Sequence, residues 1–203
     1  MRKLAYLAAG TIVLTLVATL TFQRAPAAQQ TAPPANDSLI APRLDAHEMA
    51  SLKGPRQPIF FRHDIHAGQY KIQCQYCHYT VGVSSEPGIP SLATCMGCHN
   101  VITGSDSVAK AEIAKIRVAY DPYKPMAGQK GIEWVRVHQL ARHAHFPHMR
   151  HIKAMGPNAC YTCHGEVSRM PQVFQVNNIN NMGFCITCHI ERKVTRDCTV
   201  CHY

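Results

Sequence analysis

The chain has 203 residues, a formal net charge of +9, ten cysteines and 13 histidines. No segment has the pattern of a nucleic-acid-binding module, so the positive charge does not by itself indicate a nucleic-acid partner. All ten cysteines fall within five short motifs, which leaves none over for a separate structural disulfide.

The N-terminal segment has the features of a membrane anchor. After Met1-Arg2-Lys3, 19 residues from Leu4 to Phe22 carry no charge. As a helix this run would be about 28 Å long, close to the roughly 30 Å hydrocarbon core of a bilayer. The basic start predicts a cytoplasmic N-terminus, with the rest of the chain on the periplasmic or extracellular side of the inner (cytoplasmic) membrane.

A cleaved signal peptide is the alternative, because Ala25-Pro26-Ala27 weakly resembles a cleavage site. The apolar region of such a peptide usually has about 7–15 residues, however, and this run is longer. We therefore predict an uncleaved transmembrane anchor over residues 1–24 and a linker rich in Ala, Pro and Gln over residues 25–55.

Five Cys-x-x-Cys-His motifs dominate the rest of the chain. They read Cys74-Gln75-Tyr76-Cys77-His78, Cys95-Met96-Gly97-Cys98-His99, Cys160-Tyr161-Thr162-Cys163-His164, Cys185-Ile186-Thr187-Cys188-His189 and Cys198-Thr199-Val200-Cys201-His202. This is the attachment signature of c-type haem, in which the cysteines form thioethers with the haem vinyl groups and the histidine binds the iron. The motifs predict five covalently bound haem c groups, each with a proximal histidine.

Zinc binding and disulfides are the alternatives for paired cysteines. Histidine fills 13 of the 203 positions. By chance, a histidine would follow all five pairs on the order of one time in a million, so the pattern favours haem.

Five haems would change both the charge and the core. A bis-histidine haem with both propionates ionised carries about −1 when ferric and about −2 when ferrous. Five haems would therefore add roughly five to ten negative charges and bring the protein nearer neutrality, so the basic residues are better interpreted as propionate partners. About 160 residues cannot also build an ordinary side-chain core, so the chain is expected to wrap the haems in short helices and loops.

An internal duplication organises the chain. Phe-x-His-x-x-His occurs at Phe61/His63/His66 and at Phe146/His148/His151, and a haem motif begins 11 or 12 residues after the first histidine of each pair. A second motif begins 21 residues later in the first copy and 25 later in the second. This arrangement resembles the multihaem cytochrome c3 and c7 class. The resemblance implies a mainly irregular fold with small α-helices, and distal iron ligands at His63, His66, His148 and His151. The two histidines of each pair would serve different haems.

These features divide the chain after the linker into a first c7-like dihaem unit (56–105), a bridge (106–138) and a second unit with three motifs (139–203). Within the bridge, residues 105–120 are predicted to form a helix. Ala109, Ile113, Ile116 and Tyr120 would share one face, and Asp106 or Ser107 would cap its start. The Asp121-Pro122 pair would end this helix, and a short extended segment is expected near Trp134.

The fifth distal ligand remains open between two side chains. His138, at the end of the extended segment, is our first choice, and Met170 is the alternative that would raise the potential of its haem. Met182 and Met96 are better interpreted as packing residues. His143 and His145 are candidate propionate or surface partners, and His47 lies near the linker.

The segment from Trp134 to His189, with "EWVRVH", "FPHMRH", "CYTCHGEVSRM" and "NMGFCITCH", is more distinctive than the motifs. It resembles the pentahaem cytochrome c subunits of alternative complex III, from about Pro58 to His202. The resemblance implies an electron-transfer subunit beside an iron–sulfur subunit and polytopic quinol-binding subunits. Electrons would pass from this subunit to a soluble or monohaem cytochrome c or to a copper protein. The basic, His-rich "QLARHAHF" departs from the family pattern.

The sequence leaves two alternatives to an electron-transfer subunit. A membrane-anchored multihaem quinol dehydrogenase of the NapC/NrfH type would place a haem motif close to the anchor, whereas here the first begins about 50 residues beyond it. A catalytic multihaem reductase needs one iron with an open position, and this chain has enough candidates to fill all five.

Overall fold

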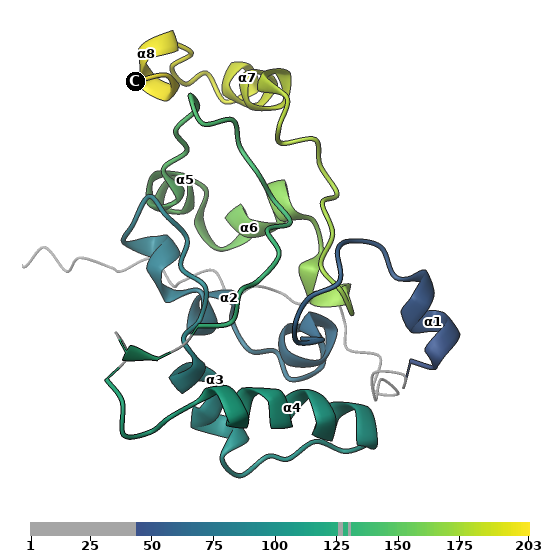
Figure 1. Ribbon diagram of the computed structural model, residues 1–203. Coiled ribbons are helices and arrows are strands. Elements are labelled where there is room, and N and C mark those ends of the chain that lie inside the picture. The colour runs from purple at the N-terminus through teal and green to yellow at the C-terminus, as the bar shows by residue number, and fades with distance from the viewer. Residues whose placement is uncertain (1–43, 126–127, 130) are drawn as a thin grey trace, which may run out of the picture.

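The computed structural model describes residues 44–125, 128–129 and 131–203 (Figure 1). The predicted anchor and most of the predicted linker lie outside these ranges. The described chain consists of short helices and turns joined by irregular segments, with no β-strand in those ranges. This confirms the expectation of a small, mainly helical and irregular domain. None of the described helices is long and apolar enough to cross a membrane.

Each haem motif lies on a short helix of its own. These helices are α2 (Cys74–Cys77), α3 (Leu92–His99), α6 (Ala159–His164), α7 (Met182–Glu191) and α8 (Cys198–Cys201). One helical turn brings residues i, i+3 and i+4 to the same face, so both cysteines and the histidine of a motif can point the same way. Side chains of Ser91, Asn181 and Asp197 cap the starts of α3, α7 and α8.

The motif helices do not follow sequence order in space. Figure 1 shows α3 at one end of the domain, α2 and α6 in its middle, and α7 and α8 at the other end. The chain therefore places its second motif at one extreme and its fifth at the other.

The bridge helix α4 (Ser107–Ala119) confirms its predicted cap and buried face. The Asp106 carboxylate accepts a hydrogen bond from the Ala109 N–H at 2.9 Å, and Ile113 and Ile116 are buried. Ile116 joins the small apolar cluster that holds α4 against α3. Arg117 donates to the carbonyl of His99 at 2.6 and 3.1 Å, which satisfies the C-terminal end of the second motif helix.

The segment predicted to be extended has no β-ladder partner. Instead, the Gln57 side chain binds both backbone groups of Val135, donating to its carbonyl and accepting from its N–H, each at 2.9 Å. This pair of hydrogen bonds mimics a strand pair and fixes the chain that leads from Trp134 to His138.

Two close contacts join the duplicated units. The π-helical turn η1 (Asp64–Gln69) meets the 3-10 turn η5 (Val167–Arg169), and the Asp64 N–H donates to the Met170 carbonyl at 3.2 Å. A Cβ atom at Gly68 would lie 2.2 Å from the Ser168 carbonyl oxygen, so only glycine allows this approach. At the second contact, α5 (His148–Met155) lies against η2 (Tyr79–Gly82).

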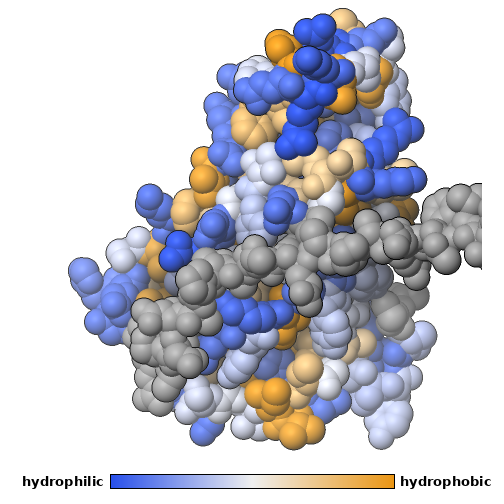
Figure 2. Space-filling view, turned by 180° about the vertical axis from the view of Figure 1, so that it is seen from behind, coloured by the Kyte–Doolittle hydropathy of each residue, from blue (hydrophilic) through white to orange (hydrophobic). Residues whose placement is uncertain are grey.

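The remaining described elements are α1 (Ala46–Ser51) and η4 (Gly156–Asn158). A capping box of Asp45 and Glu48 caps the start of α1. The side-chain core is small, and within the described ranges no large side chain is completely buried. Figure 2 shows apolar and polar residues interspersed over one face. A domain of this size normally buries a continuous apolar core, so the fold leaves room for prosthetic groups to act as core.

Candidate haem sites

The two histidine pairs adopt the same geometry in both copies of the repeat. Phe61 meets the His63 ring edge-on at 4.7 Å and stacks on His66 at 4.4 Å. Phe146 repeats this, with 4.8 Å to His148 and 4.0 Å to His151. The phenyl ring thus wedges the two imidazoles apart, so that the first and second histidines face different directions.

The second histidine of each pair faces the second motif histidine of its unit. The ring centroids of His66 and His99 are 6.0 Å apart, and those of His151 and His189 are 6.2 Å apart. Two imidazoles on opposite sides of one iron have ring centroids about 6 Å apart, given iron–nitrogen bonds of about 2 Å. Both pairs therefore have the separation that a bis-histidine haem requires.

The first histidine of each pair lies near the first motif histidine of its unit. Burial, with a smaller contribution from the neighbouring His78, lowers the pKa of His63 to about 4. Burial likewise lowers the pKa of His164 to about 4, with added effects of His138, His148 and His78. These imidazoles are neutral at physiological pH, and the neutral ring is the form that binds a metal.

Hydrogen bonds fix which nitrogen of each ring is available. Four motif histidines direct Nδ1 at backbone carbonyls: His78 at Gly88, His99 at Ile102, His189 at Thr195 and His202 at His143, at 2.6–3.2 Å. Three repeat histidines do the same: His66 to Arg62, His148 to Ser85 and His151 to Pro147, at 2.8–3.1 Å. A ring that donates from Nδ1 keeps the Nε2 lone pair for iron.

His63 departs from this rule. Its Nδ1 is buried and lacks a hydrogen-bond partner among the described residues. A buried, unpaired imidazole nitrogen is costly unless a further group meets the ring. Such a group is expected here, because His63 lies between the first motif and the contact of η1 with η5. This contact is called the joint of the two units.

The two candidates for a fifth distal ligand, His138 and Met170, lie apart from each other, and so do the remaining histidines. His138 lies against His164, with Nε2 3.4 Å from the His164 Nδ1. His143 lies beside His202 with ring centroids 5.5 Å apart, and His145 stacks on Tyr203 at 4.3 Å. Met170 is buried at the joint between the units, and His47 is exposed on α1. The choice between His138 and Met170 stays a prediction.

Cysteines of different haem motifs lie near one another, and these pairs give the motifs an order in space. Burial raises the pKa of Cys77, and the nearby Cys98 contributes; Cys74 and Cys160 lie within hydrogen-bonding reach, which raises the pKa of Cys160. Burial also raises the pKa of Cys163 and that of Cys185, with contributions from Cys188 and Cys185 to the first and from Cys201 to the second. The motif neighbours are thus second–first, first–third, third–fourth and fourth–fifth. All ten cysteines are free of disulfides.

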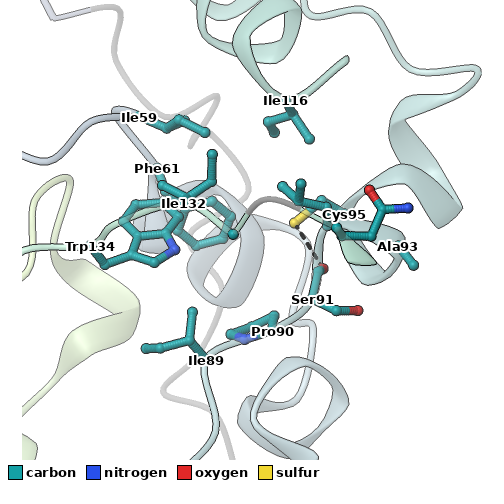
Figure 3. A pocket seen from close by; sticks show the side chains of 13 residues that line it. Ile59, Phe61, Ile89, Pro90, Ser91, Ala93, Cys95, Ile116, Ile132 and Trp134 are labelled. Carbon is teal, nitrogen blue, oxygen red and sulfur yellow. Dashed lines mark hydrogen bonds between the residues drawn. The ribbon is translucent and has the colours of Figure 1, made fainter. Parts of the chain in front are cut away.

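A cavity of about 260 Å³ opens beside the second motif (Figure 3). Cys95 reaches it from α3, while Phe61, Ile132 and Trp134 line the opposite wall. The Cys95 thiol donates to the Ser91 carbonyl at 3.6 Å. An apolar cavity that contains an attachment cysteine and borders the Phe61–His66 stack fits the edge of a porphyrin.

The carbonyl acceptors of Gly88, Ile102 and Thr195 could not be found from the sequence, because every residue has a carbonyl. Phe61 and Phe146 were visible as part of the repeat, but their wedging role was not. Which repeat histidine lies opposite which motif histidine could not be predicted either, because this depends on how the turns face each other.

Comparisons with known proteins agree with this chemistry. Residues 41–126, which contain the first two motifs, match the class III cytochrome C family. Over 108 residues the chain is 29% identical to the multihaem cytochrome c subunit of a menaquinone reductase from Nitratidesulfovibrio vulgaris. That alignment covers 53% of this chain and 45% of the relative, so the chain spans about half the length of the protein it matches.

The matched segment, residues 41–126, is therefore similar to multihaem cytochromes c of the class III (c3/c7) type. Proteins of this type carry covalently bound haem c and transfer electrons. The relative is named as a subunit of a menaquinone reductase.

Proposed function

We propose that the chain is a pentahaem electron-relay subunit of a membrane-bound, quinone-linked oxidoreductase related to alternative complex III. The observation that carries this proposal is the unbroken series of neighbouring motif cysteines, in the order second, first, third, fourth, fifth. Such a series supports a path along which single electrons can cross the whole domain. The partners would be an iron–sulfur subunit, polytopic quinone-binding subunits, and a soluble or monohaem cytochrome c or copper protein.

Within this proposal, four irons would be held by histidine pairs. His63 would pair with His78, His66 with His99, His148 with His164, and His151 with His189. The ring separations of 6.0 and 6.2 Å support the second and fourth pairs, and electrostatic proximity supports the first and third. His202 would bind the fifth iron as proximal ligand, and its distal ligand stays open.

The chain's own residues would position the redox groups and keep water away. Haem iron supplies one-electron exchange without bond making. Carbonyl bonds to Nδ1 fix the planes of seven of these imidazoles and raise their basicity as ligands. Phe61 and Phe146 hold neighbouring rings apart, and apolar residues such as Trp134 exclude water beside Cys95.

The direction of electron flow has two candidates. Alternative complex III oxidises quinol, so electrons would pass from the membrane subunits through this chain to a periplasmic acceptor. The name of the relative, a menaquinone reductase, favours the opposite direction, from a soluble donor to menaquinone. The same relay serves both directions, and the potentials of its partners would decide between them.

The cofactor content is the first prediction. The intact mass of the purified protein should exceed that of the polypeptide by five haem groups, and denaturation should release none, because each is bound through thioethers. Electrospray mass spectrometry of the denatured protein checks this. Fewer than five haems, or bound zinc, would contradict the proposal.

The membrane anchor is the second prediction. We propose that Leu4–Phe22 is retained as a single span, with the haem domain on the periplasmic side. The protein should stay with membranes after a salt wash and require detergent for release. N-terminal sequencing that begins near Ala28 would show instead that the segment is cleaved.

The dependence on partners is the third prediction and the test of the function. The isolated subunit should accept electrons from dithionite and pass them to a soluble high-potential cytochrome. It should exchange electrons with a menaquinol analogue only when the co-purifying membrane subunits are present, because the proposal places the quinone site in those subunits. Stopped-flow spectroscopy of the two preparations compares the rates. Rapid reduction of the subunit alone would support the NapC/NrfH-type alternative, and turnover of nitrite or hydroxylamine would support a reductase.

A further inference from the structure

One motif histidine has a partner unlike the others. His78, His99, His189 and His202 each direct Nδ1 at a backbone carbonyl. His164 directs Nδ1 at a side chain, the Nε2 of His138, at 3.4 Å. The two rings are perpendicular, with centroids 4.4 Å apart and an interplanar angle of 85°. His138 thus stands where a carbonyl stands in the other four motifs.

Haem attachment at the third motif would fix the direction of this hydrogen bond. His164 can bind iron through Nε2 only if that nitrogen keeps its lone pair, so the proton of the neutral ring must be on Nδ1. Nδ1 then donates, and the His138 Nε2 accepts. An Nε2 lone pair used in this way is not available to a second iron, and His138 would keep its own proton on Nδ1.

The surrounding chain holds both rings in place. His138 follows the segment that Gln57 binds through both backbone groups of Val135. His164 ends α6, where Asn177 donates to the Thr162 and Cys163 carbonyls at 3.2 and 3.0 Å. The contact therefore joins two independently fixed segments rather than two mobile side chains.

We propose that His138 is a positioning residue that orients the proximal His164 and lowers the reduction potential of the haem at the third motif. This inference rests on the proposed function, because it requires a haem there. A neutral imidazole nitrogen is a more basic acceptor than a peptide carbonyl, so it leaves more electron density on the ligand and stabilises ferric iron. The third motif neighbours the first across the joint of the units, so His138 tunes the haem through which the two units exchange electrons.

The test compares His138→Phe with His138→Gln in the full-length holoprotein. His138→Phe removes the acceptor but keeps a planar ring, and His138→Gln restores an acceptor oxygen. A matched control is His47→Phe, because the His47 side chain is exposed on α1. Intact mass confirms haem content, electron paramagnetic resonance reports the spin state and ligand field, and redox titration gives the five potentials.

His138→Phe should keep all haems low-spin, raise one potential and shift the g-values of one haem. His138→Gln should restore part of both changes, and His47→Phe should cause neither. A high-spin haem in His138→Phe would overturn the proposal and make His138 a distal iron ligand. Unchanged potentials and g-values would also overturn it.

If His138→Phe fails to fold, His138→Gln decides alone. A smaller shift of the same haem is then expected, and no shift would contradict the proposal. A natural chain without a haem at the third motif would instead refute the proposed function, and the mass of the proteolytic peptide that contains Cys160 and Cys163 would show it.

Discussion

Replacing His66 with Ala should convert one low-spin haem to a high-spin, five-coordinate haem that binds carbon monoxide. The His66 ring lies 6.0 Å from the His99 ring, the separation expected across one iron, and alanine has no atom that could take its place. The Nδ1 bond from His66 to the Arg62 carbonyl, at 2.8 Å, shows that the ring is already oriented for this role. Electron paramagnetic resonance of the ferric protein and the spectrum of the reduced protein with carbon monoxide measure the change.

Two further variants make this test specific. His66→Met should keep a low-spin haem but raise its potential, because a thioether is a weaker donor to ferric iron than imidazole. His47→Ala should change neither property, since His47 is exposed on α1. If every haem stayed low-spin in His66→Ala, the pairing of His66 with His99 would be wrong.

The attachment cysteines and most of the candidate iron ligands could be predicted from the sequence. Thioether attachment requires two cysteines and a histidine at fixed spacing, and the duplicated Phe-x-His-x-x-His then picks four of the eight remaining histidines. The bridge helix was also predictable, because Asp106 is a strong cap and Ile113 and Ile116 share a face. These features depend on residues close together in the chain.

The features that escaped prediction depend on contacts between distant segments. The sequence favoured His138 over Met170 as the fifth distal ligand, but only the fold shows His138 against His164 and Met170 at the joint of the units. That joint forms because Gly68 lets η1 approach the Ser168 carbonyl, which no local pattern indicates. The order of the motifs in space follows from the same contact, because it brings the first motif to the third.

The order of the haems leads to the last prediction, which compares the loss of two neighbouring haems. Cys95→Ala with Cys98→Ala would remove the haem at the end of the proposed series, and Cys74→Ala with Cys77→Ala would remove the next one. After rapid partial reduction by pulse radiolysis, the first variant should equilibrate as fast as the natural protein, because its four haems still form one series. The second should show an additional, much slower phase, because the haem at Cys95 is cut off from the other three.

Electron tunnelling rates fall exponentially with distance, so a missing haem within the series should have a far larger effect than a missing terminal haem. The Cys77–Cys98 and Cys74–Cys160 proximities place the first motif between the second and the third. If the haems instead followed the order of the sequence, loss of the second would isolate the first, and the two results would be exchanged. Mass spectrometry must first show four haems in each variant, so that the kinetics compare relays of equal size. The pair of variants thus decides whether electrons follow the fold or the sequence through this protein.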